Sequence, residues 1–327
     1  MGSTKELSKG QAENMSFGNG LYDVIILATT RNIPVLKVSL PYIRTNLDAN
    51  SIKIIANVRD KQEIESIGAV FIDETSIYEG MSLDSVMDII KSICGETKRV
   101  GWYLQQFIKM SWCYKSTDSY YVVFDADTIP LHHINYISDN KYLLTQKMEY
   151  HKPYFDTIDR LFNGTVKRQI EGSFIAENMI IDTSIMKEML DEISNNEDLR
   201  GNNFYEKILY AINPKDILGS GFSEFETYGN YIMSKYPDKV KIRKLKTLRE
   251  AMQIISSSPS VKQLDWASRD YEIISIEASD YKKTFLTWLT KKVIIQKMFS
   301  MKTIASGRTK IRTLYRRLIH KDDMVFD

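Results

Sequence analysis

Residues 121–128 read Tyr-Val-Val-Phe-Asp-Ala-Asp-Thr, and this stretch indicates the class of fold. Its first four residues are apolar, which is typical of a strand buried on both faces of a sheet. The strand delivers two carboxylates, Asp125 and Asp127, at its carboxyl end. Because the ligand crevice of an open α/β sheet lies at that end of the strands, the stretch predicts an α/β fold with a polar site after this strand.

The residues before this stretch alternate between predicted strands and helices. Strands are expected at 22–28, 51–58, 69–73 and 120–124, and helices begin near Pro34, Asp60, Ser82 and Gly101. Pro41 should end or kink the first helix. Asp60 with Glu63 resembles a capping box, and Gly68 should end that helix. Such alternation implies βαβ units and a mostly parallel sheet.

The second half is less regular. Strands are expected at 141–145, 174–182 and 273–276, and helices at 183–194, 203–212, 223–236 and 247–256. The regular alternation of strands and helices ends near residue 130. We therefore expect one fused domain over residues 21–281, with a nucleotide-type half (21–131) and a substrate half (132–281).

The composition describes a folded globular protein of 327 residues, 43% hydrophobic and 26% charged. The formal net charge of +2 argues against a dedicated nucleic-acid binder, so no nucleic-acid partner is expected. Cys94 and Cys113 form no zinc pattern and suit a reducing compartment. The sequence contains no apolar run of about 18 residues, the length that a transmembrane helix needs. We therefore expect a cytoplasmic protein. Residues 1–20 are expected to be a disordered arm or a remnant of a cloning tag.

The motif Asp125-Ala126-Asp127 resembles the Asp-x-Asp motif of GT-A-fold glycosyltransferases. Together with Gly101-Trp-Tyr-Leu-Gln-Gln-Phe-Ile-Lys109, it is similar to bacterial members of the capsule and O-antigen type, which build surface polysaccharides. The resemblance covers residues 20–240 and implies a mostly parallel central sheet flanked by helices. It also implies a sugar transferred from a nucleotide diphosphate donor, for which we expect a UDP-sugar, to a glycan or lipid-linked glycan.

The resemblance implies that Asp125 and Asp127 hold Mn²⁺ or Mg²⁺ on the donor diphosphate. Such ions are held by one or two carboxylates plus substrate phosphates, and the metal then stabilises the leaving group as a Lewis acid. Further donor-binding candidates are Ala28, Thr29, Thr30, Arg31, Asn57, Arg59, Gln105, Lys109 and Ala126. Many family members have a late histidine as third ligand, but none of His132, His133, His151 and His320 suits that role, which water can fill.

The acceptor side is expected in two elements of the second half. By resemblance, Glu171, Gly172 and Ser173 line the sugar and acceptor, and glycine permits close backbone approach. If the reaction inverts the anomeric centre, a carboxylate must accept the acceptor proton. Glu226 fits a capping box with Ser223, which leaves Glu224 as the candidate base.

Two other functions fit the acidic motif. In a haloacid-dehalogenase-type phosphatase, Asp125 would be the nucleophile and Asp127 the acid/base. The preceding α/β half and the lack of a later acidic metal motif count against that reading. The other alternative is a catalytically silent binding module with a GT-A-like fold.

The C-terminal residues 282–327 are predicted to form a basic amphipathic helical tail. Residues 282–321 contain twelve Lys and Arg and no Asp or Glu, while residues 1–281 carry a net charge of −7. In 308–319 the apolar residues recur at helical spacing. A basic amphipathic helix is typical of proteins that bind anionic membranes, so we expect a peripheral position on the inner face of the cell membrane.

Overall fold

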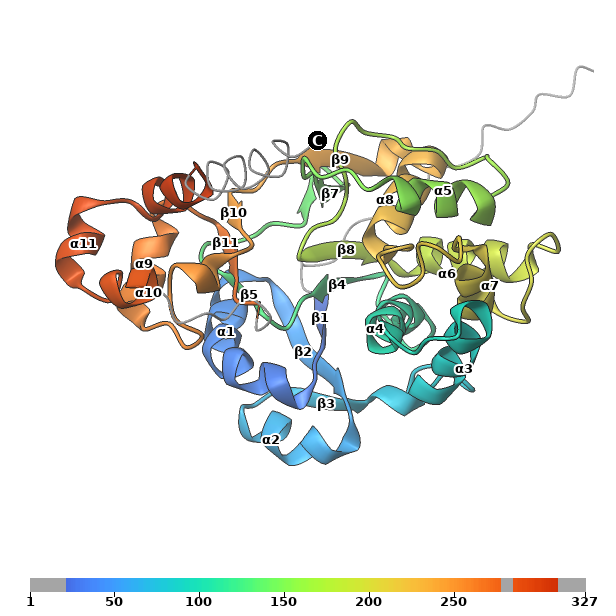
Figure 1. Ribbon diagram of the computed structural model, residues 1–327, viewed down its shortest axis with the longest axis horizontal. Coiled ribbons are helices and arrows are strands. Elements are labelled where there is room, and N and C mark those ends of the chain that lie inside the picture. Colours follow the sequence, from blue (N-terminus) through green and yellow to red (C-terminus); the bar gives the residue numbers. More distant parts are fainter. Residues whose placement is uncertain (1–21, 278–284, 311–327) are drawn as a thin grey trace, which may run out of the picture.

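The computed structural model describes residues 22–277 and 285–310, and its centre is a five-stranded sheet (Figure 1). The strands are β1 (Tyr22–Leu27), β2 (Ala49–Ala56), β3 (Val70–Asp73), β4 (Tyr120–Phe124) and β8 (Asn178–Asp182), in the order β3-β2-β1-β4-β8. The first four are parallel, and β8 runs antiparallel to β4. The predicted α/β class with a mostly parallel central sheet is therefore confirmed.

Helices flank this sheet. They are α1 (Ile33–Asn46), α2 (Lys61–Ser66), α3 (Leu83–Cys94), α4 (Val100–Ser111), α5 (Lys152–Leu161), α6 (Thr183–Asn195), α7 (Phe204–Ala211) and α8 (Glu224–Lys235). Ser82 accepts from the N–H of Ser85 and caps α3, as its sequence predicts. The glycine at the end of α3, Gly95, adopts a left-handed conformation that other residues rarely take.

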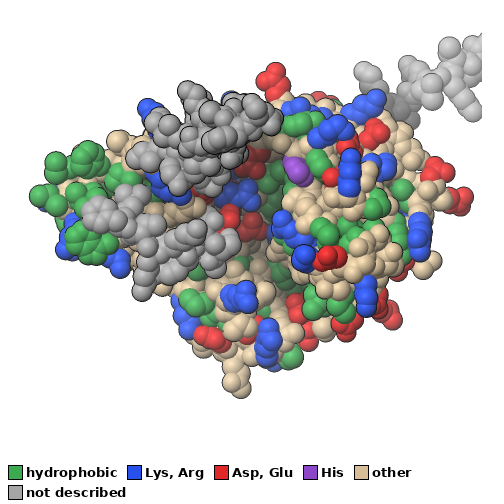
Figure 2. Space-filling model, viewed as in Figure 1, with side chains coloured by type: hydrophobic (Ala, Val, Ile, Leu, Met, Phe, Trp, Pro, Cys, Tyr) green, Lys and Arg blue, Asp and Glu red, His purple; other side chains and the backbone are tan. Residues whose placement is uncertain are grey.

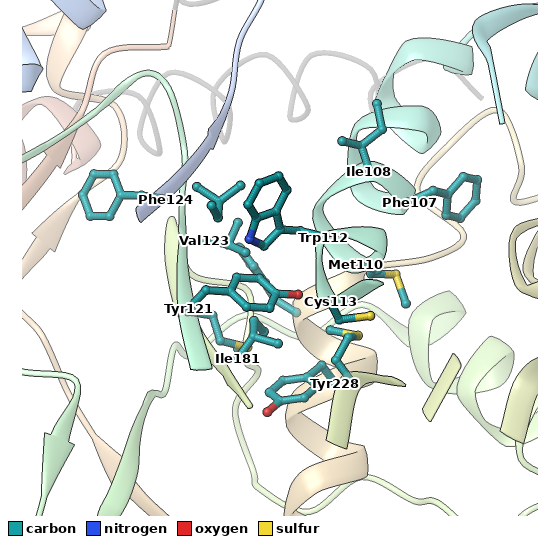
Figure 3. Packing of buried hydrophobic residues seen from close by; sticks show 14 of the residues in the cluster. Phe107, Ile108, Met110, Trp112, Cys113, Tyr121, Val123, Phe124, Ile181 and Tyr228 are labelled. Carbon is teal, nitrogen blue, oxygen red and sulfur yellow. The ribbon is translucent and has the colours of Figure 1, made fainter. Parts of the chain in front are cut away.

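Helix α4 is held against β4 by large buried side chains (Figure 3). Tyr121 and Val123 of β4 face Trp112 and Cys113 in the 3-10 turn that directly follows α4, Trp112–Tyr114, while Phe124 points to the opposite face of the sheet. The alternation follows from the two-residue period of a strand, with apolar residues on both faces. This packing fixes the position of α4 relative to the residues that follow β4.

Two smaller sheets complete the second half. One consists of β10 (Thr247–Leu248), β11 (Ile273–Ser275) and β5 (Thr128–Pro130), and the other of β6 (Ile137–Ser138), β7 (Lys141–Thr145) and β9 (Val240–Arg243). A second apolar core forms beside the first of these sheets, around Trp266 of α9 (Val261–Ser268) and the fully buried Met301.

Two local predictions are wrong, and one of the two outcomes expected at Pro41, an end of the helix, does not occur. Helix α1 does not end at Pro41 but continues to Asn46, and its buried face includes Leu40 and Ile43 on either side of the proline. The predicted helix at 247–256 is instead β10 followed by one 3-10 turn, Ala251–Gln253, because Thr247 and Leu248 pair with β11. Asp60 makes no side-chain cap on α2, since its carboxylate accepts from Thr30 instead.

The C-terminal part that the structure describes begins with two short helices, α10 (Phe285–Leu289) and α11 (Val293–Met298), and residues 301–310 are helical. None of the helices in 22–277 or 285–310 has both the length and the hydropathy needed to cross a bilayer. The predicted arm at 1–20 and most of the predicted amphipathic helix, 311–319, lie outside the described residues.

Candidate active site

Three loops meet at the carboxyl edge of the central sheet because β1, β2 and β4 are parallel neighbours. Thr29, Thr30 and Arg31 follow β1 and are exposed, while Ala28 is buried at the strand end. The hydroxyl of Thr30 donates to Asp60 Oδ1 at 2.8 Å, which ties the loop after β1 to the loop after β2.

The loop after β2 contains Asn57 and Arg59. The side-chain oxygen of Asn57 accepts from the N–H of Arg59, and its amide nitrogen donates to Glu74 at 3.1 Å. The Arg59 side chain is 72% exposed, and its Nε lies 3.9 Å from Asp60 Oδ2. The structure thus brings the donor-binding candidates from β1 and β2 to one edge.

The acidic loop after β4 is clamped by backbone hydrogen bonds on both sides. The N–H of Asp125 donates to the carbonyl of Glu177 at 2.9 Å, and the carbonyl of Asp127 accepts from the N–H of Ile276 at 2.7 Å. Ala126 between them is buried. The two carboxylates therefore project from a backbone held by β8 on one side and β11 on the other.

Lys109 bridges the acidic loop and helix α8. Its ammonium donates to Oδ1 of Asp125 at 2.7 Å and to Oε1 of Glu224 at 2.9 Å. The Lys109 side chain is only 8% exposed. Burial alone would lower the pKa of Lys109, but the two carboxylates outweigh it and place that pKa above its ordinary value. A permanently charged cation thus lies beside Asp125.

Gln106 is a site residue that the sequence reasoning missed. Its Oε1 accepts from the N–H of Glu224 at 3.1 Å, and its Nε2 donates to the carbonyl of Trp102. Gln106 is buried, whereas the predicted Gln105 is partly exposed. The helical spacing could have identified Gln106. It lies three residues before Lys109 and Gln105 lies four before it, so both share a helix face with Lys109.

Asp127 has a strongly perturbed carboxyl group. Burial, and then the neighbouring charges of Asp125 and Glu277, raise the pKa of Asp127 to about 7, although Lys109 acts in the opposite direction. Negative charge therefore exceeds positive charge around this carboxylate. A divalent cation would relieve that excess, and hard oxygen donors are the ligands that Mg²⁺ and Mn²⁺ prefer.

Within the part of the chain that the structure describes, Asp125 and Asp127 have no third side chain grouped with them for a metal ion. Within the described residues, no three His, Cys, Asp or Glu side chains are grouped so as to hold a metal ion. His132 and His151 instead contact the backbone carbonyls of Ser268 and Ser220, and His133 contacts Asp48. Asp125 and Asp127 fit a metal whose remaining ligands are phosphate and water oxygens.

The predicted acceptor element, Glu171 to Ser173, lies beside a second buried ion pair. A Cβ at Gly172 would overlap the carbonyl of Lys147, so the close approach that this glycine permits is to the protein's own chain. Ser173 pairs with Lys147 in a β-bridge, and Glu171 is exposed. The Lys147 ammonium lies 3.0 Å from Glu177, and Arg249 lies 2.9 Å from Glu277. The sequence reasoning did not identify these two pairs.

Figure 2 shows a hollow near the middle of this face, in the region where Figure 1 shows β4 and β8. Its floor carries acidic and basic side chains next to one another. This mixture of charge suits a ligand that is itself part anionic and part neutral and polar, such as a phosphorylated sugar.

A protein-family model described as "Family of unknown function (DUF6492)" matches residues 44–315 of the chain. No curated protein sequence matches it. Among solved structures, the chain is similar to the apo form of mouse xyloside xylosyltransferase 1, at 10% identity and a TM-score of 0.41 over 80% of this chain and 99% of that one.

Two further solved structures are similar at the same level. The galactosyltransferase LgtC, in complex with donor and acceptor sugar analogs, has 9% identity and a TM-score of 0.41 over 77% of this chain and 86% of that one. The apo structure of the bifunctional glycosyltransferase WbbM has 9% identity and a TM-score of 0.40 over 79% of this chain and 46% of that one.

Proposed function

The chain belongs to DUF6492, a family of unknown function, and we propose that it is a metal-dependent glycosyltransferase with a GT-A-like fold. The observation that carries the proposal is the acidic pair Asp125 and Asp127 at the carboxyl edge of a parallel sheet, beside the buried cation Lys109. This combination suits the transfer of a sugar from a nucleotide diphosphate, because the reaction releases a leaving group that is rich in negative charge.

On the donor side, Asp125 and Asp127 would hold Mn²⁺ or Mg²⁺, which as a Lewis acid stabilises the charge on the leaving diphosphate. Thr29, Thr30 and Arg31 would bind the nucleotide, with Asn57 and Arg59 at its base or ribose. Lys109 holds Asp125 in place and adds a fixed positive charge beside the diphosphate. We expect the donor to be a UDP-sugar.

On the acceptor side, Glu224 is the candidate base. Lys109 donates to its Oε1, which orients the carboxylate and leaves Oε2 to accept the proton of the acceptor hydroxyl. The N–H of Glu224 is held by Gln106, so the start of α8 is fixed relative to α4. Within the predicted acceptor element, the exposed Glu171 would contact the acceptor, a glycan or a lipid-linked glycan of surface-polysaccharide synthesis, while the buried Gly172 and Ser173 hold this backbone against Lys147. Residues 282–321 would hold the enzyme on the anionic inner face of a bacterial membrane.

The proposal is tested by a thermal-shift screen of nucleotide sugars with and without Mn²⁺. A ligand at a hundredfold excess over its dissociation constant raises the stability of the folded state by about 2.7 kcal/mol. We expect a nucleotide diphosphate sugar to raise the melting temperature only with metal, and Asp125→Asn to abolish the shift. Asp139→Asn, on an exposed carboxylate that pairs with Lys241, is the matched control and should keep the shift.

Activity assays on the same purified protein distinguish the transferase from a phosphatase and from a silent binding module. Rapid phosphate release from a generic phosphomonoester with Mg²⁺ would favour a phosphatase in which Asp125 is the nucleophile, and would overturn the transferase. Metal-dependent binding of a nucleotide sugar without transfer or hydrolysis, over a panel of sugar acceptors, would indicate a silent binding module.

A further inference from the structure

A separate pocket of about 320 Å³ lies between the start of α9 and helix α11. Its lining includes Ser256, Ser258, Ser260, Lys262, Gln263 and Lys291. No lining residue is acidic. Three serines and two lysines form a site that offers hydrogen-bond donors and positive charge, and these are the groups that bind phosphate oxygens.

The start of α9 adds backbone donors to this pocket. Ser260 caps the helix by accepting from the N–H of Gln263, while the N–H groups of Val261 and Lys262 make no backbone hydrogen bond to a described residue. Free N–H groups at the first turn and the helix dipole both favour an anion there.

Gln263 supports the start of α9 beside the pocket. Gln263 lines the pocket and is only 3% exposed. Its Oε1 accepts from the N–H of Ser260, but its Nε2 has no hydrogen-bond partner among the described residues. Because that nitrogen has almost no exposed surface, the groups that the pocket offers to an anion are the exposed ammonium groups of Lys262 and Lys291 and the N–H groups at the start of α9.

The rim of the pocket is apolar and exposed, which indicates where the anion comes from. Val293 lines the pocket and is 47% exposed, and Ile294 and Met298 on the same helix are about two thirds exposed, at 65% and 66%. Trp288 and Phe299 are also exposed. Helix α11 lies at the left end of the molecule, and Figure 2 shows hydrophobic and basic side chains together at that end. Exposed apolar side chains beside lysines are typical of a membrane-binding surface.

We propose that this pocket binds the phosphate group of an anionic phospholipid while the apolar side chains of α11 enter the membrane interface. The pocket supplies selectivity for the phosphate, through Lys262, Lys291 and the N–H groups at the start of α9. The apolar rim supplies affinity for the bilayer. The inference rests on the membrane position proposed above for residues 282–321. It does not rest on sugar transfer, since the pocket shares no residue with the site around Asp125.

The first arm of the test measures the phosphate site. Inorganic phosphate is titrated into the full-length protein and followed by NMR or thermal shift. Lys262→Gln with Lys291→Gln should weaken phosphate binding by about tenfold or more, from about 1 kcal/mol lost per lysine. Lys297→Gln with Lys302→Gln removes the same charge from nearby exposed positions outside the pocket lining, and should leave phosphate binding within about twofold. Equal phosphate affinity in both double variants would overturn the pocket.

The second arm identifies the source of the phosphate. The full-length protein is sedimented with vesicles of phosphatidylcholine, with and without phosphatidylglycerol. We expect binding only to the vesicles that contain phosphatidylglycerol. Ile294→Ser with Met298→Ser should reduce vesicle binding by about tenfold, since each buried apolar side chain contributes roughly 1 kcal/mol or more, and should leave the affinity for inorganic phosphate unchanged. Vesicle binding that this variant does not reduce would overturn the lipid as the source, as would phosphate binding without any vesicle binding.

Discussion

Lys109 donates from its buried ammonium to Oδ1 of Asp125 at 2.7 Å and so ties helix α4 to the acidic loop after β4. The same ammonium contacts Glu224 at the start of α8. One side chain thus links three elements that come from distant parts of the sequence. Both the stability of the fold and the geometry of the site therefore depend on Lys109.

Lys109→Met should lower the free energy of unfolding by about 3 kcal/mol, because it leaves the buried Glu224 carboxylate without its cation. Chemical denaturation at pH 8 measures the loss. Lys115→Met is the matched control, because Lys115 is exposed, and it should change stability by less than about 0.5 kcal/mol. Losses of equal size in the two variants would show that the Lys109 bridge contributes nothing.

Asp127→Asn should stabilise the metal-free protein by about 1–3 kcal/mol at pH 8, since the native state raises the pKa of Asp127 to about 7 and so disfavours its charged form. The Asp127 side chain is partly exposed, and solvent screening there accounts for the lower value of this range. Thermal unfolding in EDTA measures the effect. Adding Mn²⁺ and a nucleoside diphosphate should then stabilise the wild type but not the variant. A destabilised variant in EDTA would contradict this account of Asp127.

Glu226→Gln should change how stability depends on pH. Burial raises the pKa of Glu226 to about 7, although Asn230 and Phe174 donate hydrogen bonds to it. Between the unfolded pKa near 4.5 and the folded value near 7, the native state binds more protons than the unfolded state. Stability from this group is therefore present at low pH and is lost as the pH rises through that window.

The loss amounts to about 3 kcal/mol between pH 4.5 and pH 8 in the wild type, and Glu226→Gln should lack it. Unfolding measured across this range for both proteins gives the difference, in which the contributions of all other groups cancel. If the free energy of unfolding depends on pH in the same way in both proteins, the titration does not belong to Glu226.

Gly229→Ala should be strongly destabilising, because a Cβ on this residue of α8 would overlap the fully buried ring of Phe174. Overpacking of this kind lowers stability by about 1–3 kcal/mol. Gly101→Ala is the contrasting control: nothing lies within 4 Å of the added Cβ, and in helix α4 alanine should stabilise by about 0.5–1 kcal/mol. The melting temperatures should move in opposite directions, and a shift of the same sign in both would contradict the packing argument.

Several parts of the fold were predictable because they depend on local patterns. The strands predicted at 22–28 and 120–124 correspond to β1 and β4. Apart from Asp23 these segments are apolar, as a strand buried on both faces requires. Ser82 predicted the start of α3 through its capping hydrogen bond. The segment 247–256 was predicted wrongly, because pairing with β11, far along the chain, overrode its local helical spacing.

The sequence by itself determined that two carboxylates follow a buried strand of a parallel sheet. The reason is that strand direction and burial follow from the order and composition of neighbouring residues. Only the tertiary structure decided what surrounds them: Lys109 meets Glu224 across 115 positions, and Gln106 holds the same helix start. The pocket between α9 and α11 likewise joins residues about 30 positions apart. Such contacts depend on how whole helices pack against the sheet, and no local periodicity encodes that packing.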